Sequence, residues 1–403
     1  PVLPQGMARR TTLDFLKTEA GSGVLLAAVA VAAVILANSP LADRYFAFAA
    51  MPIPVRIGPF AHTLSVAHWI EDGLMAIFFF VVGMEIKFEV LKGELSNPRR
   101  LALPVIAAVG GMAVPALLYL AVNLGPDGLP RGWAIPTATD IAFALAALAV
   151  AAPRLPPPLR IFLLTLAIVD DLGAVAIIAL AYTEEVRLTA LAGALLVLAA
   201  LAVLGAWKRA PFLFYGVGFV LVWAFTLESG INTSLAGVAC ALTIPTGSRR
   251  PGQDSVLKYF MDSLHPYVAY AILPLFAFVA AGFSLADLSL RQAGSPLTLG
   301  IMLALLVGKP LGVFGFAALA AWLKLGRRPT GVSWMEMFGA SVLCGVGFTM
   351  SLFIGALAFG PDGDGIDGQV RLGVVTASLL AALIGGVILN RAQKRRLAAG
   401  EAP

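Results

Sequence analysis

Long apolar runs alternate with short polar connections along most of the chain. A helix that crosses a bilayer needs about 20 mostly apolar residues, so each such run is read as a membrane span. The pattern predicts twelve helices, over residues 20–38, 65–92, 101–123, 132–150, 157–183, 188–206, 211–228, 231–246, 264–284, 297–319, 334–358 and 370–391. The expected fold class is an all-α polytopic membrane protein, organised as one integral membrane domain over residues 1–403.

The composition agrees with this class. Hydrophobic residues make up 59% of the chain and charged residues only 13%, whereas a soluble domain carries about 25% charged residues. The net charge of +5 does not indicate a nucleic-acid partner, because the basic residues follow the predicted membrane topology. The bilayer is the expected environment.

Lysine and arginine set the predicted orientation. Of the 28 basic residues, 21 fall on one side of the predicted helices and six on the other. By the positive-inside rule both termini are cytoplasmic, which requires an even number of spans and agrees with twelve. The remaining basic residue, Lys309, falls inside an apolar run over residues 300–319.

The first external connection, residues 43–63, is long and punctuated by glycine and proline. Its partial alternation is typical of a small β-hairpin, whose exposed edge would be able to pair with a second copy of the chain. A disordered loop explains the same residues equally well.

Two adjacent carboxylates, Asp170 and Asp171, stand in the middle of the apolar run from Ile161 to Tyr182. One aspartate at the bilayer centre costs about 2.5–3.5 kcal/mol, and such residues almost always face a protein interior or a water-filled path. The alternative is a short loop between two half-length helices, but no other residue in the run supports a loop.

Two predicted helices are interrupted. The fourth carries Pro136, Thr139 and Asp140, and the eleventh carries glycines and hydroxyls over residues 344–351. Paired interruptions in two halves of a chain point to a transporter binding site. Helices 3–5 (residues 101–183) and 10–12 (297–391) are offset by an odd number of spans, so they would form inverted repeats. The alternative, that Gly and Pro are simply common in membrane helices, is weakened by the charge at the first break.

The charges deep in apolar runs are Asp140, Asp170, Asp171 and Lys309. Oxygen ligands suit Na⁺, Li⁺ or protons, and such buried groups titrate as a coupled set. Asp140 would offset facing helix N-termini and Lys309 facing C-termini. The alternative is that Lys309 extends toward the surface.

The remaining metal-binding residue types show no such pattern. Cys240 and Cys344 lie in apolar runs without a partner at metal-ligand spacing, so both are expected to be buried free thiols. His62 and His68 fall near the predicted outer surface and are expected to be solvated side chains.

Several motifs closely resemble those of NhaA-type Na⁺/H⁺ antiporters, and together they extend from the first predicted helix to the last. They are Asp72-Gly73-Leu74-Met75-Ala76, Val82-Gly83-Met84-Glu85-Ile86-Lys87, Ala138-Thr139-Asp140-Ile141-Ala142-Phe143-Ala144-Leu145, Asp170-Asp171-Leu172-Gly173-Ala174, Ala269-Tyr270-Ala271-Ile272-Leu273-Pro274-Leu275-Phe276-Ala277-Phe278, Gly308-Lys309-Pro310-Leu311-Gly312 and Gly345-Val346-Gly347-Phe348-Thr349-Met350-Ser351.

The resemblance implies an electrogenic exchanger of a bacterial inner membrane that moves more protons inward than Na⁺ or Li⁺ outward, without a cofactor. It makes Asp171 the principal ion ligand and Asp170 its partner, paired with Lys309 in one protonation state. Thr139 and Asp140 match the unwound part of the fourth helix, with Thr139 as a further ion ligand. The family also uses the first external hairpin to form a homodimer.

The resemblance also implies regulatory residues, namely Glu85, Glu89, His265 and Asp72. Relatives with strong pH control tend to have an arginine between the two acids of the second helix, where this chain has Phe88. The pH activation is therefore expected to differ from that of such relatives.

Two other classes also use membrane carboxylates. An intramembrane aspartyl protease takes its two acids from different helices with a Gly-x-Gly-Asp signature, which is absent here. A cation channel lines its pore with rings of acids, whereas inverted interrupted helices favour alternating access. The preferred hypothesis is a secondary antiporter and not an enzyme.

Overall fold

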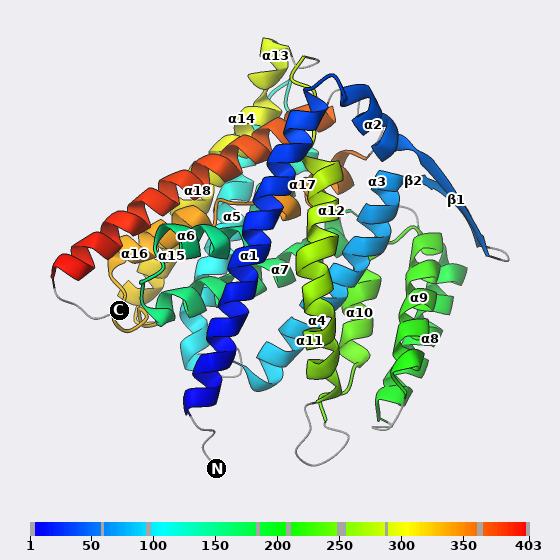
Figure 1. Cartoon of the computed structure of the whole chain (residues 1–403), viewed down its shortest axis with the longest axis horizontal. Helices are drawn as coiled ribbons and strands as arrows, with labels where there is room; N and C mark the ends of the chain where they lie inside the picture. The colour runs from blue at the N-terminus through cyan, green and yellow to red at the C-terminus, as the bar shows by residue number, and fades with distance from the viewer. Residues whose placement is uncertain are drawn as a thin grey trace. The chain divides into compact units, whose positions relative to one another are not determined.

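A computed structural model describes residues 5–57, 60–93, 98–182, 186–206, 211–247, 255–286, 289–360 and 366–399 of the chain. The described part is mostly helical, with one two-stranded sheet (Figure 1). Seven helices are long and apolar enough to cross a membrane, and up to ten if each of three bent helix pairs counts as one span. The chain is therefore a multi-pass membrane protein.

The first half of the described chain contains α1 (Gln5–Ala37), α2 (Ala42–Ala50), β1 (Pro52–Ile57), β2 (Phe60–Ser65), α3 (Val66–Trp69), η1 (Ile70–Leu74), α4 (Met75–Lys92), α5 (Pro98–Asn123), η3 (Pro130–Thr137), α6 (Ile141–Ala151), α7 (Pro157–Ala181) and α8 (Leu188–Ala206). The second half contains α9 (Phe212–Ser229), α10 (Ser234–Thr243), α11 (Val256–Tyr267), η4 (Val268–Ile272), α12 (Leu273–Ala281), α13 (Leu290–Ala293), α14 (Pro296–Leu303), η5 (Ala304–Gly308), α15 (Lys309–Trp322), α16 (Trp334–Leu343), α17 (Phe348–Phe359) and α18 (Ile366–Ala398).

Two of the twelve predicted helices do not qualify as spans by length and composition. The helix α4 is 18 residues long but carries Glu85, Lys87, Glu89 and Lys92, and α10 has only 10 residues. The count of twelve stays a prediction, since it needs both of these helices to cross the membrane.

The segment over residues 43–63, which the sequence predicts to be external, is partly helical. The helix α2 occupies its first part, where the sequence from Asp43 to Ala50 contains neither glycine nor proline. The hairpin follows, with β1 and β2 antiparallel in a register that pairs Pro52 with Ser65. The indole Nε1 of Trp69 donates to the carbonyl of Ile53 at 3.0 Å, which fixes the hairpin against α3.

The chain folds as two compact units. The first contains Pro1–Ala32, Ala102–Asp170 and Leu285–Pro403, and the second contains Ala33–Leu101 and Asp171–Ser284. Both predicted repeats, residues 101–183 and 297–391, fall mainly in the first unit.

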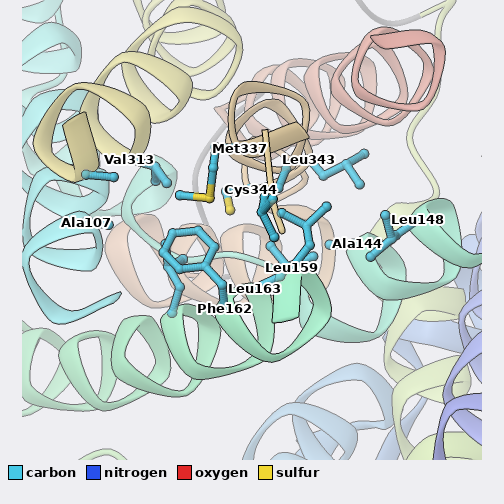
Figure 2. Packing of buried hydrophobic residues seen from close by; sticks show 14 of the residues in the cluster. Ala107, Ala144, Leu148, Leu159, Phe162, Leu163, Val313, Met337, Leu343 and Cys344 are labelled. Atoms are coloured by element: carbon cyan, nitrogen blue, oxygen red, sulfur yellow. The ribbon is translucent and has the colours of Figure 1, made fainter. Parts of the chain in front are cut away.

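The first unit has an apolar core contributed by α5, α6, α7, α15, α16 and α18. Figure 2 shows Phe162 and Leu163 of α7 packed with Met337 of α16, and both Phe162 and Met337 are buried. The helices α5 and α15 approach closely at Gly312. A Cβ atom placed on this residue would lie only 2.1 Å from the carbonyl oxygen of Gly110. Glycine at position 312 therefore sets the separation of the two helices.

In the second unit α4 packs along α10. A Cβ on Gly237 would lie 2.2 Å from the carbonyl oxygen of Ala76, so only glycine permits this contact. Lys87 of α4 donates to the carbonyls of Leu242 and Ile244 at 2.6 Å each. These bonds satisfy carbonyls that the short helix α10 leaves open at its C-terminal end.

Candidate functional site

Two broken helices meet in the first unit. The segments η3 and α6 are bent by 45° at residues 138–140, and α16 and α17 are bent by 42° at residues 344–347. The backbone N–H of Asp140 donates to the carbonyl of Val346 at 2.7 Å, so the two breaks contact each other directly. The expectation that the fourth and eleventh helices are discontinuous is confirmed.

The carboxylate of Asp140 lies at the N-termini of both second halves. Its Oδ1 accepts from the backbone N–H of Phe143 at 3.0 Å and caps α6. Its Oδ2 accepts from the N–H and hydroxyl of Thr349, in the first turn of α17, at 3.1 and 2.6 Å. Each helix N-terminus carries about half a positive charge, so one buried carboxylate offsets both, as the sequence predicted.

The second cluster joins Lys309, Asp170 and Thr139, which are all fully buried. The ammonium of Lys309 donates to Asp170 Oδ2 at 2.6 Å and to the carbonyl of Thr137, the last residue of η3, at 2.5 Å. The hydroxyl of Thr139 lies 2.8 Å from the same Asp170 oxygen and 3.0 Å from the carbonyl of Cys344. The alternative that Lys309 extends to the surface is therefore wrong, and its charge lies at a helix C-terminal end.

The backbone before Lys309 contains a single π-helical turn, η5, which separates α14 from α15. Pro310 follows at the second position of α15 and has no N–H to donate to the preceding turn. A wider turn accommodates such a proline within a continuous span. The span from Arg291 to Trp322 is therefore continuous, and Lys309 stands inside it.

The helix α7 is unbroken through Asp170 and Asp171, so the alternative of a loop at these residues is wrong. Asp171 is also buried, with 3% of its surface exposed. Neighbouring side chains on an α-helix diverge by about 100°, so the two carboxylates point in different directions, and that of Asp170 pairs with Lys309. In the described part of the chain, Asp170 Oδ1 has no hydrogen-bond partner.

The residues expected to regulate activity belong to the second unit. His265 Nδ1 lies 3.6 Å from Glu85 Oε1, and Glu89 follows Glu85 by one helical turn on α4. Asp72 lies in the π-helical turn η1. Its backbone carbonyl accepts from Trp223 at 2.7 Å and from the hydroxyl of Thr233 at 2.8 Å.

Sequence reasoning missed three contacts. Thr349 stands in a motif that was singled out, but its role as partner of Asp140 appears only in the fold. The contact of His62 was also missed: its Nε2 lies 2.9 Å from Glu228 Oε1, 166 residues away, although the side chain stays 26% exposed. His68 Nδ1 lies 2.7 Å from Ser65 Oγ, which the sequence did not show either. Both cysteines are buried free thiols, as expected.

Broken membrane helices that enclose a buried lysine–aspartate pair are typical of ion-coupled transporters. The chain matches the family described as Na⁺/H⁺ antiporter 1 over residues 13–389, and it belongs to that family. The resemblance seen in the motifs is thus confirmed.

Individual relatives extend over nearly the whole chain. It is 46% identical over 384 residues to the Na⁺/H⁺ antiporter NhaA of Pseudomonas putida, which covers 94% of this chain and 97% of that protein. It is 46% identical over 397 residues to the Na⁺/H⁺ antiporter NhaA 1 of Syntrophotalea carbinolica, with coverage of 98% and 100%. The Na⁺/H⁺ antiporter NhaA of Nitrobacter hamburgensis is 49% identical over 395 residues, with coverage of 96% and 94%.

Proposed function

We propose that this chain is a secondary antiporter that exports Na⁺ or Li⁺ in exchange for protons. The observation that carries the proposal is the fully buried Lys309–Asp170 pair beside the two broken helices, in a chain 46–49% identical to proteins named Na⁺/H⁺ antiporters. Neither a protease nor an open channel needs a lysine that forms a buried ion pair with one of its aspartates.

The exchange chemistry follows from charge balance. With Lys309 protonated and Asp170 ionised, the buried pair is neutral. A Na⁺ ion that entered beside it would add an uncompensated charge in a buried place, which is costly. The site therefore holds a cation well only after a proton has left, so the two ions bind alternately and as a coupled set.

We assign distinct roles to the two aspartates. Asp170 is the partner of Lys309, and its free Oδ1 lone pairs remain available to a cation. Asp171 is the principal ligand, and Thr139 supplies a further oxygen. If Lys309 and Asp171 each give up one proton for one Na⁺, two positive charges move inward for one outward, and exchange is electrogenic.

The wider architecture is part of the same proposal. Twelve helices in a single transporter domain would contain inverted repeats over residues 101–183 and 297–391, with the breaks at corresponding positions, and would expose the site alternately to each face. Both termini would be cytoplasmic in a bacterial inner membrane, and transport would serve pH and sodium homeostasis. The β1–β2 hairpin would form the homodimer contact, because a two-stranded sheet leaves its outer edges unpaired.

We propose that Glu85, Glu89, His265 and Asp72 adjust the activity with pH. The 3.6 Å separation of His265 and Glu85 supports this role, since histidine changes its charge in the physiological range.

The test is cation-induced dequenching of a pH dye in everted membrane vesicles, with Na⁺, Li⁺ and K⁺ across a range of pH. We expect Asp171→Asn to abolish the Na⁺ and Li⁺ responses, because it removes the carboxylate that binds the cation. Asp127→Asn makes the same chemical change at an exposed residue and should leave exchange intact. Unchanged exchange by Asp171→Asn at a normal level of protein in the membrane would overturn the assignment. Cation flux without coupled proton movement would indicate a channel instead.

A further inference from the structure

The connection between α15 and α16 exposes apolar and aromatic side chains at the end of a membrane span. The span that contains α15 ends at Trp322, which is 78% exposed. Trp334, the first residue of α16, is 39% exposed, and Leu323 and Leu325 between them are also exposed. We call residues 322–334 the tip segment. Exposed tryptophans at a span end are typical of residues that lie at the membrane interface.

The same segment is strongly basic. Lys324, Arg327 and Arg328 are all exposed, and within the described ranges none of them has an acidic partner. The acid beside them, Glu336, is already engaged, because its Oε1 lies 3.1 Å from Arg396 at the end of α18. The positive charges of the tip segment are therefore not neutralised by this part of the protein.

The end of α18 adds further positive charge to this face. Arg396 donates to the carbonyl of Gly331 at 2.7 Å, and Arg395 lies 3.6 Å from the sulfur of Met335. Figure 1 shows this end of α18 beside α16. The tip segment and the end of α18 thus form one basic face.

Arg328 is oriented by an aromatic ring. Its guanidinium carbon lies 5.4 Å from the centre of the Trp334 ring, and this ring packs edge-to-face against Phe314. A guanidinium stacked on an aromatic ring uses its flat face for this contact. Its N–H groups lie in the plane and stay available for a bidentate contact with a phosphate.

Lys324 has an unusual backbone conformation. Its φ of 58° is the single positive value for a non-glycine residue in the described part of the chain. The N–H of Leu325 donates back to the carbonyl of Ala320 at 2.9 Å, so Lys324 occupies the left-handed position that glycine usually fills at a helix end. A lysine is disfavoured there, and strain of this kind points to a use for the side chain.

We propose that the tip segment binds the headgroup of an anionic phospholipid. Lys324, Arg327 and Arg328 contact the phosphodiester, while the exposed tryptophans and leucines lie among the glycerol and upper acyl groups. A free phosphate would satisfy the charges but would leave the apolar side chains in water, whereas a lipid covers both. The proposal is independent of the ion-exchange site.

The test uses the purified full chain in phosphatidylcholine nanodiscs, with phosphatidylglycerol added in steps and bound lipids counted by native mass spectrometry. The tip variant carries Lys324→Gln, Arg327→Gln and Arg328→Gln. Each basic residue near an anionic surface contributes about five-fold in affinity, so the tip variant should bind phosphatidylglycerol about a hundredfold more weakly. Equal binding by the tip variant and the wild type would overturn the proposal.

The matched control removes the same three charges from exposed arginines elsewhere, with Arg44→Gln, Arg56→Gln and Arg291→Gln. This variant should bind phosphatidylglycerol as the wild type does. An equal loss in both variants would show a general effect of net charge and would refute a site at the tip segment.

Two further measurements separate a lipid from a free anion and separate binding from folding. Millimolar inorganic phosphate should not raise the melting temperature, and stabilisation by phosphate equal to that by phosphatidylglycerol would contradict the lipid assignment. Lys324→Gly should raise the melting temperature in phosphatidylcholine, because glycine fits the positive φ, yet it should weaken phosphatidylglycerol binding about five-fold. Unchanged binding by Lys324→Gly would exclude Lys324 from the site.

Discussion

Replacing Lys309 by methionine would remove the ammonium and keep most of the side-chain volume. Lys309 donates to Asp170 at 2.6 Å and to the carbonyl of Thr137 at 2.5 Å, and the lysine and the aspartate are fully buried. Breaking a buried ion pair by removing one partner costs about 3–5 kcal/mol. Thr139 still donates to Asp170, so we expect a loss of about 4 kcal/mol in the free energy of unfolding.

The companion substitution Asp170→Asn separates charge from packing. In the double variant of Lys309 and Asp170 neither of these two buried positions carries a charge. We expect its loss of stability to be smaller than the sum of the two single losses by about 2–3 kcal/mol, which is the coupling found for residues in direct contact.

The assay is thermal unfolding of the four proteins of this double-mutant cycle, purified in one detergent. For a chain of this length about 4 kcal/mol corresponds to a fall of roughly 5 °C in melting temperature. The control is Lys92→Met, which removes an exposed lysine that donates to the carbonyl of Thr246 at 2.9 Å and should change stability by less than about 1 kcal/mol.

Two results would refute this reasoning. The first is a Lys309→Met protein that melts no lower than the wild type, and the second is a double variant whose loss equals the sum of the two single losses. Either result would mean that the buried pair carries no net interaction between Lys309 and Asp170.

Two other substitutions test the packing and the capping of the first unit. Gly312→Ala should destabilise the protein by about 1–3 kcal/mol, because the added Cβ would overlap the carbonyl of Gly110. The control is Gly315→Ala on the same helix, where an added Cβ has no heavy atom within 4 Å. It should be neutral or stabilising in the same melting assay. Asp140→Ala should cost about 2–4 kcal/mol, since it removes a cap and the charged bonds to Thr349; Asp140→Asn, which keeps an acceptor oxygen, should lose less, and an equal loss would show that charge alone matters.

The local features of the site were predictable from the sequence. An aspartate close to a proline inside an apolar run indicated the break near Pro136 and Asp140, because a charge inside the bilayer is costly without a structural reason. The charge at the ends of broken helices gave Asp140 its expected place at the helix N-termini. The charges within apolar runs likewise selected Asp170 and Lys309 as members of one site.

The contacts between distant segments were not predictable in the same way. Nothing in the residues around Thr349 shows that it bonds to Asp140, and His62 looks like an ordinary surface histidine until the fold brings Glu228 to it. The helix α2 was also missed, since a helix of nine residues is too short to give the long apolar run that reveals a span. Such pairs depend on tertiary packing, which hydropathy does not encode.

The two aspartates of α7 show what the sequence pattern, the family resemblance and the fold can each establish. Adjacency alone did not rank them, and the resemblance to the antiporter family separated their roles. The fold pairs Asp170 with Lys309, in agreement with the resemblance. The assignment of Asp171 as the principal ion ligand stays a prediction.

The bond between Asp140 and Thr349 also constrains the order in which the protein is made. The two residues are 209 positions apart, so at about 5–20 residues per second the ribosome makes Asp140 roughly 10–40 s before Thr349. During that interval the growing chain contains Asp140 but not yet α17, so the contact with Thr349 is missing. The crossing of the broken helices can close only after α17 has been synthesised, which makes it a late step of membrane assembly.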